Sequence, residues 1–228
     1  MKTTTNQNHK ILKQQFKYEF LNTIQKLKNQ NKIVLGLSGG SSLNIFYTDF
    51  VNIFSEIDLE TRTKIYFCFL DERVVDFEDD DSNYKQLKNL FLNKLIEKGY
   101  INQSQILLPD FSLTEYETDY FNQVKHIDIG LFGVGPDCHT CSLFPNHALL
   151  SDTTYGYLKI SDSPKPPSDR ITISVNMLHD TKYAFAFFMG ESKIEAYKKF
   201  MNEKISVYDC PIKLIKKCEN VFVFSDIT

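Results

Sequence analysis

The sequence has 228 residues, of which 42% are hydrophobic and 24% are charged, and its formal net charge is −3. This is the composition of a globular protein with enough apolar material for a sizeable core. A slightly negative chain without a basic stripe argues against binding to nucleic acid or to a membrane surface, and no apolar run approaches the ~20 residues of a membrane span. A small anionic ligand stays compatible with the charge, because a few local cations and backbone amides are enough to hold one.

The sequence also indicates the cellular location and the number of domains. Residues 1–15 are polar and lack the apolar segment of a secretory signal, so we expect the protein to be cytoplasmic. The five cysteines are odd in number and mostly scattered, which disfavours a disulfide framework. We find no internal repeat and no linker, so we expect one domain over residues 1–228. Its oligomeric state is expected to be a monomer or a weak homodimer.

Short apolar runs alternate with longer amphipathic stretches, which is typical of βαβ units. We therefore expect a single-domain α/β fold, with a doubly wound, mostly parallel sheet and helices on both faces (Rossmann-like). A serine at residue 112 with Glu115 three residues later predicts a capping box at the start of one helix. In chain order, we predict a helix over 7–30, a strand over 32–37, a helix over 42–54 and a strand over 65–70. Helices over 82–98 and 112–124 follow, and then a strand over 127–132 and a loop-rich segment over 145–169 with a short strand near 156–160. The last predicted elements are strands over 171–175 and 183–188, helices over 191–200 and 212–217, and a strand over 221–224.

Ligands of open α/β sheets bind outside the carboxyl ends of the strands, so motifs directly after strands are the candidates for function. Residues 36–42 (GLSGGSS) follow the first predicted strand and open a helix. Glycines let the backbone approach a ligand, and a helix start offers free N–H groups to an anion. The segment is no Walker A loop, because the Gly-Lys-Ser/Thr ending is absent. We interpret it as a phosphate-binding loop, with a plain strand-to-helix turn as the alternative.

Residues 71–73 (DER) follow the strand over 65–70. Two carboxylates and a guanidinium at a strand end suit proton chemistry and anion recognition, although a solvated charged surface would have the same residues. The acidic run 78–81 (EDDD) is interpreted as a solvated loop rather than a metal site, because consecutive side chains in a loop rarely converge on one ion.

Residues 133–145 (GVGPDCHTCSLFP) follow the strand over 127–132 and carry the strongest candidate for chemistry. Asp137 can orient the imidazole of His139 and stabilise its protonated form. The loop fails as a dinucleotide fingerprint, because Cys138 stands where G-x-G-x-x-G needs its third glycine. The C-x-x-C of Cys138 and Cys141 keeps a thiol–disulfide role open, whereas a tetrahedral zinc site would need more ligands.

Two further cations lie at element junctions. Arg170 follows a proline-rich loop, and Lys193 lies in the turn between a strand and the next helix. Both are candidates for holding a phosphate, with plain surface cations as the alternative.

These segments together resemble the 6-phosphogluconolactonase family, within the wider group that includes glucosamine-6-phosphate deaminases. The resemblance extends from about residue 10 to about residue 225, and is carried by GLSGGSS, DERVVDFEDDDSNY, GVGPDCHTCSLFP, PPSDRITISVNML and MGESK. The second and third segments point to the lactonase branch. Deaminases usually have a tyrosine in place of Arg73, and they continue the histidine motif toward Asn-Glu-Pro instead of the Leu-Phe-Pro found at 143–145.

The resemblance implies hydrolysis of 6-phospho-D-glucono-1,5-lactone to 6-phosphogluconate in the oxidative pentose phosphate pathway, without metal or organic cofactor. A small sugar phosphate is then the expected partner. By the same resemblance, His139 is the general base and Asp137 its partner, Asp71 and Arg73 line the site, and the phosphate is held by Gly39, Gly40, Ser41, Ser42, Arg170 and Lys193.

The sequence departs from the family pattern at a few positions. Cys138 replaces the usual glycine before the histidine, and glycine is the residue that reaches positive φ most readily. Leu43 replaces a proline, and Asn146 replaces a common glycine at a position where asparagine tolerates left-handed backbone. Two alternatives stay open: a deaminase or isomerase acting on an amino-sugar phosphate, and a non-catalytic sugar-phosphate sensor.

Overall fold

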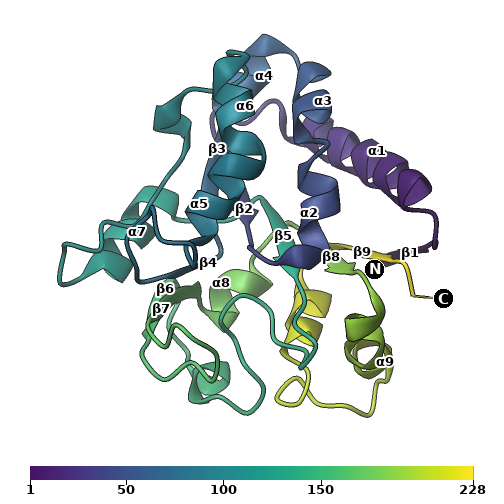
Figure 1. Cartoon of the computed structure of the whole chain (residues 1–228), viewed down its shortest axis with the longest axis vertical. Coiled ribbons are helices and arrows are strands. Elements are labelled where there is room, and N and C mark those ends of the chain that lie inside the picture. Colours follow the sequence, from purple (N-terminus) through teal and green to yellow (C-terminus); the bar gives the residue numbers. More distant parts are fainter. Residues whose placement is uncertain (228) are drawn as a thin grey trace.

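A sheet of six parallel strands forms the centre of the molecule in the computed structural model, which describes residues 1–227 (Figure 1). Each strand pairs with its neighbours through parallel ladders, and the prediction of a mainly parallel α/β sheet is confirmed. The strand order is β1 (Lys2–Thr5), β9 (Asn220–Ser225), β8 (Tyr183–Phe188), β5 (Ile129–Gly133), β2 (Ile33–Leu37) and β3 (Ile65–Phe69).

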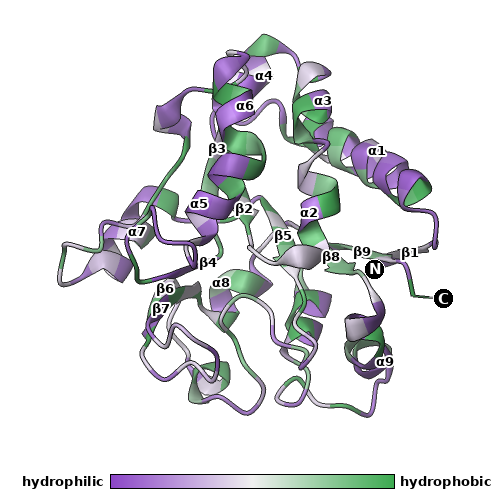
Figure 2. Cartoon of the chain, in the orientation of Figure 1, coloured by the Kyte–Doolittle hydropathy of each residue, from purple (hydrophilic) through white to green (hydrophobic). Residues whose placement is uncertain are grey.

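Helices cover both faces of this sheet, as expected. Side chains alternate along a strand, so Phe185 and Phe187 of β8 pack into one core cluster, while Ala184 and Ala186 pack into the other. Figure 2 shows the matching mixture of hydrophobic and hydrophilic residues along α1. The first cluster is covered by α1 (His9–Leu27), α2 (Ser41–Tyr47), α3 (Phe50–Ser55), α5 (Asn83–Leu87) and α6 (Asn93–Glu97), and the second by α7 (Tyr116–Val124), α8 (Val175–His179), α9 (Ile194–Met201) and the 3-10 helix η5 (Pro211–Lys217).

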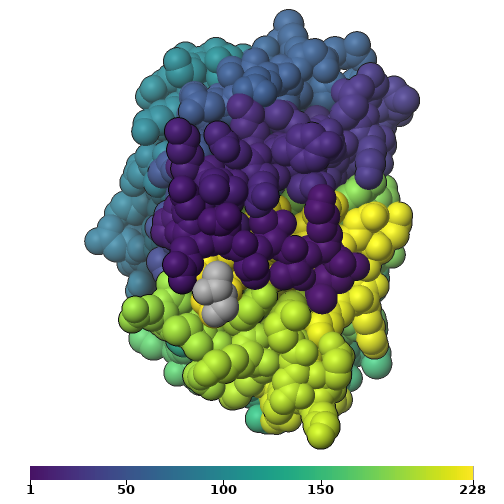
Figure 3. Space-filling view, turned by 90° about the vertical axis from the view of Figure 1, so that its right-hand side faces the viewer, coloured from purple at the N-terminus to yellow at the C-terminus, as the bar shows by residue number. Residues whose placement is uncertain are grey.

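The edge strand β1 was not predicted. Its residues are polar and mostly exposed, so they carry no hydrophobic signal, and the strand exists because its backbone pairs with β9 at the other end of the chain. Figure 3 shows the N-terminal segment packed directly beside the C-terminal part of the chain.

A second, antiparallel sheet corrects the expectation that all strands join one sheet. It consists of β4 (Asp71–Arg73), β7 (Arg170–Ile173) and β6 (Tyr157–Ile160), in that order. The chain leaves β3 at Leu70, whose carbonyl accepts a hydrogen bond from Ile173 N at 2.8 Å, and then continues as β4 in the new sheet. The DER segment, expected only to follow a strand, is therefore a strand itself.

Several helix boundaries differ from the predicted ones. The helix predicted over 42–54 is interrupted between α2 and α3, and α4 (Leu59–Lys64) and α8 were not predicted. The helix over 82–98 contains a π-helical turn, η1 (Lys88–Leu92), between α5 and α6. The predicted capping box is wrong: Ser112 Oγ donates to Asp110 at 2.6 Å instead, and α7 begins only at Tyr116. Short 3-10 helices are η2 (Gln103–Gln105), η3 (Ala148–Ser151) and η4 (Glu191–Lys193).

None of the helices in residues 1–227 is long and apolar enough to cross a membrane.

One buried carboxylate ties together the amino ends of three central strands. Asp128 precedes β5 and accepts hydrogen bonds from Val34 N at 2.9 Å, from Lys182 Nζ at 2.8 Å and from the His126 ring at 3.1 Å. Its side chain is fully buried. Burial raises the pKa of Asp128, but the hydrogen bonds from His126, Lys182 and Val34 outweigh burial and bring that pKa to about 2.

We predict that Asp128→Asn lowers the free energy of unfolding by about 2–3 kcal/mol at neutral pH, because buried donors lose a charged acceptor. The folded-state pKa is depressed, so this stabilisation is fully present above about pH 4 and is lost as the pH falls toward 2. Urea unfolding followed by circular dichroism at pH 7 and pH 3 measures both effects. Equal stability of wild type and variant at pH 7 would contradict the role given to Asp128.

Candidate active site

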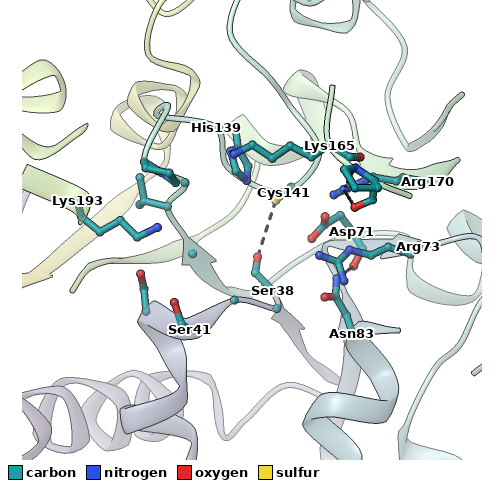
Figure 4. Close-up of a pocket in the computed structure, with 18 residues that line it drawn as sticks. Ser38, Ser41, Asp71, Arg73, Asn83, His139, Cys141, Lys165, Arg170 and Lys193 are labelled. Atoms are coloured by element: carbon teal, nitrogen blue, oxygen red, sulfur yellow. Dashed lines mark hydrogen bonds between the residues drawn. The ribbon is translucent and has the colours of Figure 1, made fainter. Parts of the chain in front are cut away.

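A cleft of about 260 Å³ opens at the carboxyl ends of β2, β3 and β5 (Figure 4). Its walls come from the loop after β2, from β4 and the start of α5, from the loop after β5, from the proline-rich loop before β7 and from η4. Asp137 is hydrogen-bonded to His139 but does not line the cleft. The predicted site residues that line the cleft are Gly39, Gly40, Ser41, Ser42, Asp71, Arg73, His139, Arg170 and Lys193.

The glycine-rich loop after β2 forms one wall of the cleft. Tyr47, buried in α2, donates to the Ser38 carbonyl at 2.8 Å and so anchors the loop to the helix that follows it. Gly39 is needed because a Cβ there would collide with the side chain of Asn83. Ser42 Oγ is buried and has no hydrogen-bond partner in the described part of the chain. This wall therefore offers unpaired polar groups to a ligand.

Side chains alternate along β4, so the three residues of the DER segment face two different environments. Asp71 and Arg73 line the cleft, whereas the side chain of Glu72 is fully buried on the other face of the strand. Asp71 Oδ2 accepts from Ser142 Oγ at 2.8 Å. Arg73 donates through NH1 to the Asp81 carbonyl, and its buried Nε has no partner within residues 1–227.

Glu72 connects β4 to the start of α5. Its carboxylate accepts hydrogen bonds from the backbone N–H groups of Asn83 and Tyr84, both at 2.7 Å, and from Ser82 Oγ at 3.3 Å. Burial raises the pKa of Glu72 to about 7, against these hydrogen bonds, which lower it. Asn83 in turn donates through Nδ2 to the Asp71 carbonyl at 2.9 Å. Glu72 thus holds the wall that contains Asp71, Arg73 and Asn83.

His139 and Asp137 form the expected pair. Asp137 Oδ1 is hydrogen-bonded to His139 Nδ1, and the imidazole packs on Phe144 with ring centroids 4.8 Å apart. Burial raises the pKa of Asp137, but the hydrogen bond and charge of His139 and those of Lys165 outweigh burial and hold it below the ordinary range. Asp137 is therefore a carboxylate that only accepts, so Nδ1 carries the proton and neutral His139 has its lone pair on Nε2.

The backbone of this loop is left-handed at Cys138, where φ is +74°. The loop keeps the conformation that the usual glycine would favour, and Asn146, at φ +59°, behaves as expected of asparagine. Gly135 is required for a different reason, because a Cβ there would collide with the ring of His139.

The two cysteines of the C-x-x-C have different partners. The Cys138 thiol lies 3.9 Å from the Ala196 carbonyl, and the neighbouring Cys210 thiol lowers the pKa of Cys138. The Cys141 thiol lies 3.9 Å from Ser38 Oγ (Figure 4), and burial raises its pKa well above the ordinary range. All five cysteines are free and buried. Cys138 and Cys141 therefore have different neighbours and are not joined by a disulfide.

The two predicted phosphate-binding cations lie on different sides of the cleft (Figure 4). Lys193, at the end of η4, is buried, and its ammonium group has no ion-pair partner in residues 1–227. Burial, and then the charge of Lys165, lower the pKa of Lys193. Arg170 donates from Nε to Pro167 O at 3.0 Å and from NH2 to the carbonyls of Lys165 and Pro166 at 3.0 and 3.1 Å. Most of its donors thus bind the neighbouring loop.

The predicted site lacked Lys165, which lines the cleft from the proline-rich loop. Its position in P-K-P-P, five residues before Arg170, was an available signal, but nothing local indicates where a loop side chain points. Asn83 and Ser38 also line the cleft without being among the predicted site residues. The acidic run over 78–81 stays outside the cleft, and its Glu78 and Asp80 pair with Lys88 and Lys85. Within residues 1–227, no group of His, Cys, Asp or Glu side chains is arranged to hold a metal ion.

A family model described as glucosamine-6-phosphate isomerases/6-phosphogluconolactonase matches residues 7–224. The chain belongs to this family. The match covers almost the whole of the central sheet and every wall of the cleft.

Curated relatives within this family carry the name of the lactonase branch. A 6-phosphogluconolactonase from Borreliella burgdorferi is 30% identical over 200 residues, covering 85% of this chain and 83% of the relative. 6-Phosphogluconolactonase 3 from a Saccharomyces cerevisiae strain is 34% identical over 184 residues, covering 74% and 72%. The human 6-phosphogluconolactonase is 30% identical over 184 residues, covering 76% and 70%.

Solved structures share the fold. The 6-phosphogluconolactonase from Leishmania guyanensis has a TM-score of 0.80 at 19% identity, covering 98% of this chain and 95% of that one. A monomeric glucosamine-6-phosphate deaminase has a TM-score of 0.79 at 19% identity, covering 99% and 97%. Because both branches of the family share this fold so closely, the fold does not discriminate between their reactions.

We predict that Glu72→Gln lowers the free energy of unfolding by about 1–3 kcal/mol, because an amide NH₂ would face backbone N–H donors that now have a carboxylate oxygen. The same change displaces the wall that carries Asp71, Arg73 and Asn83, so the catalytic activity of this site should fall by roughly tenfold or more. Denaturant unfolding and steady-state kinetics measure the two effects. Wild-type stability together with wild-type kinetics would show that Glu72 does not hold this wall.

Proposed function

We propose that this protein hydrolyses 6-phospho-D-glucono-1,5-lactone to 6-phosphogluconate, with His139 as the general base. The observation that carries the proposal is the His139–Asp137 pair, which leaves Nε2 of a cleft-lining histidine as the free basic nitrogen. The lactonase names of the curated relatives support the choice of substrate. The reaction belongs to the oxidative pentose phosphate pathway, and we infer a cytoplasmic protein that acts as a single domain, as a monomer or weak homodimer.

The substrate phosphate is assigned to the wall made by Gly39, Gly40, Ser41 and Ser42, facing Lys193. Lys193 is a buried cation without an ion-pair partner in the described chain, and Ser42 Oγ is a buried hydroxyl without a hydrogen-bond partner there. Ser42 Oγ is shielded from water without gaining a protein partner, and the Lys193 ammonium group faces the cleft without an ion-pair partner in the described chain, so a bound anion would satisfy both. Arg170 contributes its charge from the opposite side of the cleft, where its NH1 group donates to Ser142 Oγ at 3.5 Å and its other donors hold the proline-rich loop.

The reaction itself needs one acid/base group and donors for a developing negative charge. Neutral His139 takes a proton through Nε2 from a water molecule as that water attacks the lactone carbonyl. Arg73 and the N–H groups of the 133–140 loop stabilise the resulting oxyanion. The imidazolium, held by Asp137, then passes the proton to the ring oxygen as the C–O bond breaks. This sequence forms no covalent intermediate and uses no metal or organic cofactor.

The arginine at position 73 and the Leu-Phe-Pro at 143–145 favour the lactonase over an amino-sugar-phosphate deaminase. The cleft presents no acidic residue at 143–145 to serve ring opening or amine chemistry. Release of ammonia from glucosamine 6-phosphate is the assay that discriminates between the two reactions.

We predict that His139→Ala lowers kcat/KM for the freshly generated lactone by about 100- to 10,000-fold, because the general base is lost. The spontaneous rate is subtracted, and binding of 6-phosphogluconate is measured by calorimetry to show that the phosphate site survives. His9→Ala is the matched control, since His9 pairs with Asp226 outside the cleft and should leave the rate unchanged. Wild-type activity in His139→Ala would refute the assignment of the base.

We predict that Lys193→Ala raises KM by roughly 10- to 100-fold with a smaller effect on kcat, because an ion pair to the substrate phosphate is lost in ground and transition state alike. Lys198→Ala is the control: Lys198 lies on the exposed side of α9, where it pairs with Glu195. An unchanged KM in Lys193→Ala would remove this lysine from the phosphate site.

A further inference from the structure

The proline-rich loop before β7 brings a third charged group to the catalytic pair. Lys165 Nζ lies 2.8 Å from Asp137 Oδ2 and 3.2 Å from His139 Nδ1. Figure 4 shows the Lys165 side chain extending toward His139. Asp137 thus uses one oxygen for the imidazole and the other for the ammonium group. The three side chains come from two loops that are 26 residues apart in the chain.

The backbone at Lys165 is fixed by hydrogen bonds to the side chains of Arg170 and Ser163. Its carbonyl accepts from Arg170 NH2 at 3.0 Å and from Ser163 Oγ at 2.8 Å, and its N–H donates to Ser163 Oγ at 3.3 Å. Arg170 also holds the carbonyls of Pro166 and Pro167. The contact between Lys165 and the catalytic pair therefore arises from an ordered loop.

The chemistry of the contact follows from the donors that each group carries. An ammonium group can only donate hydrogen bonds, and Nδ1 of His139 already donates to Asp137. Lys165 and the imidazole are therefore two neighbouring donors that bind the same carboxylate. A cation at 3.2 Å disfavours the imidazolium, whereas the Asp137 carboxylate favours it. Lys165 thus offsets part of the effect of Asp137 on the protonation of the ring.

The other charged groups around the cleft include cations, which disfavour the imidazolium, and a carboxylate, which favours it. Arg73 and Asp71 belong to β4, Arg170 to β7 and Lys193 to η4, and all four line the same cleft as His139. Lys165 differs from them because it contacts both members of the catalytic pair directly.

We propose that Lys165 is a positioning residue that holds Asp137 in place and keeps His139 neutral, and so able to accept a proton, at lower pH than Asp137 alone would allow. The consequence for catalysis rests on the proposed lactonase function. Lys165 itself needs no contact with the reacting atoms.

The test is the pH dependence of kcat/KM for the lactone in wild type, Lys165→Met and Lys165→Arg. Methionine keeps much of the side-chain length and removes the charge, so we expect the acid limb of the profile to move upward by about one pH unit. Arginine restores the cation and should return the limb close to its wild-type position. An unmoved acid limb in Lys165→Met would overturn the proposal, whatever happens to KM.

The chain offers a matched control at the other edge of the sheet. Lys182, Asp128 and His126 form a second lysine–aspartate–histidine group outside the cleft. Lys182→Met should leave the acid limb where it is, which excludes a general effect of losing one positive charge.

A direct measurement separates this proposal from the proposed function. The imidazole signals of the five histidines are followed by NMR titration, and His139→Gln identifies the signal of His139. In Lys165→Met the titration midpoint of His139 should move upward by about one pH unit, and in Lys182→Met it should not move. A shifted midpoint in a protein without lactone hydrolysis would sustain the role of Lys165 and refute the lactonase. An unshifted midpoint in an active lactonase would refute only the role of Lys165.

Discussion

Parallel pairing of β2 with β3 and β5 brings the walls of the cleft together. In this register Leu37 lies opposite both Phe69 and Leu131, so β2 and β3 end at the same level and β5 continues to Gly133 beside them. The chain then continues into the glycine-rich loop, into β4 and into the histidine loop, which start side by side although they lie far apart in the sequence. The polar contacts between these segments, such as Ser142 on Asp71 and Cys141 beside Ser38, depend on this alignment.

The two edges of the same sheet carry similar side chains in different surroundings. At the amino edge, Asp128 is fully buried and binds Lys182 and His126 as it ties β2, β5 and β8 together. At the carboxyl edge, Asp137 binds Lys165 and His139 in a cleft that stays open to solvent. The first group serves stability because its carboxylate is fully buried and is already bound by donors from three segments, although Lys182 and His126 are themselves partly exposed. The second leaves one ring nitrogen free, which makes the same combination of residues useful for proton transfer.

The histidine loop holds this arrangement at some conformational cost. Cys138 and Cys141 both have positive φ, which non-glycine residues adopt only when surrounding contacts compensate. Gly135 N donates to the His139 carbonyl at 2.9 Å, and Ile212 N donates to the Cys138 carbonyl at 3.1 Å. These bonds connect the loop to itself and to η5. They explain how a cysteine can adopt positive φ at position 138.

The sequence by itself determined the α/β fold, the buried strands and the edge where the site lies, because hydrophobic periodicity and glycine-rich strand ends are local signals. It also singled out His139 with Asp137 and eight other residues of the cleft wall, each next to a predicted strand or helix end. The tertiary structure alone decided the pairing of β1 with β9, the second sheet and the place of Lys165. Each of these depends on contacts between residues distant in the chain. A polar edge strand has no apolar pattern, and the direction of a loop side chain is set by the groups that hold its backbone, here Arg170 and Ser163.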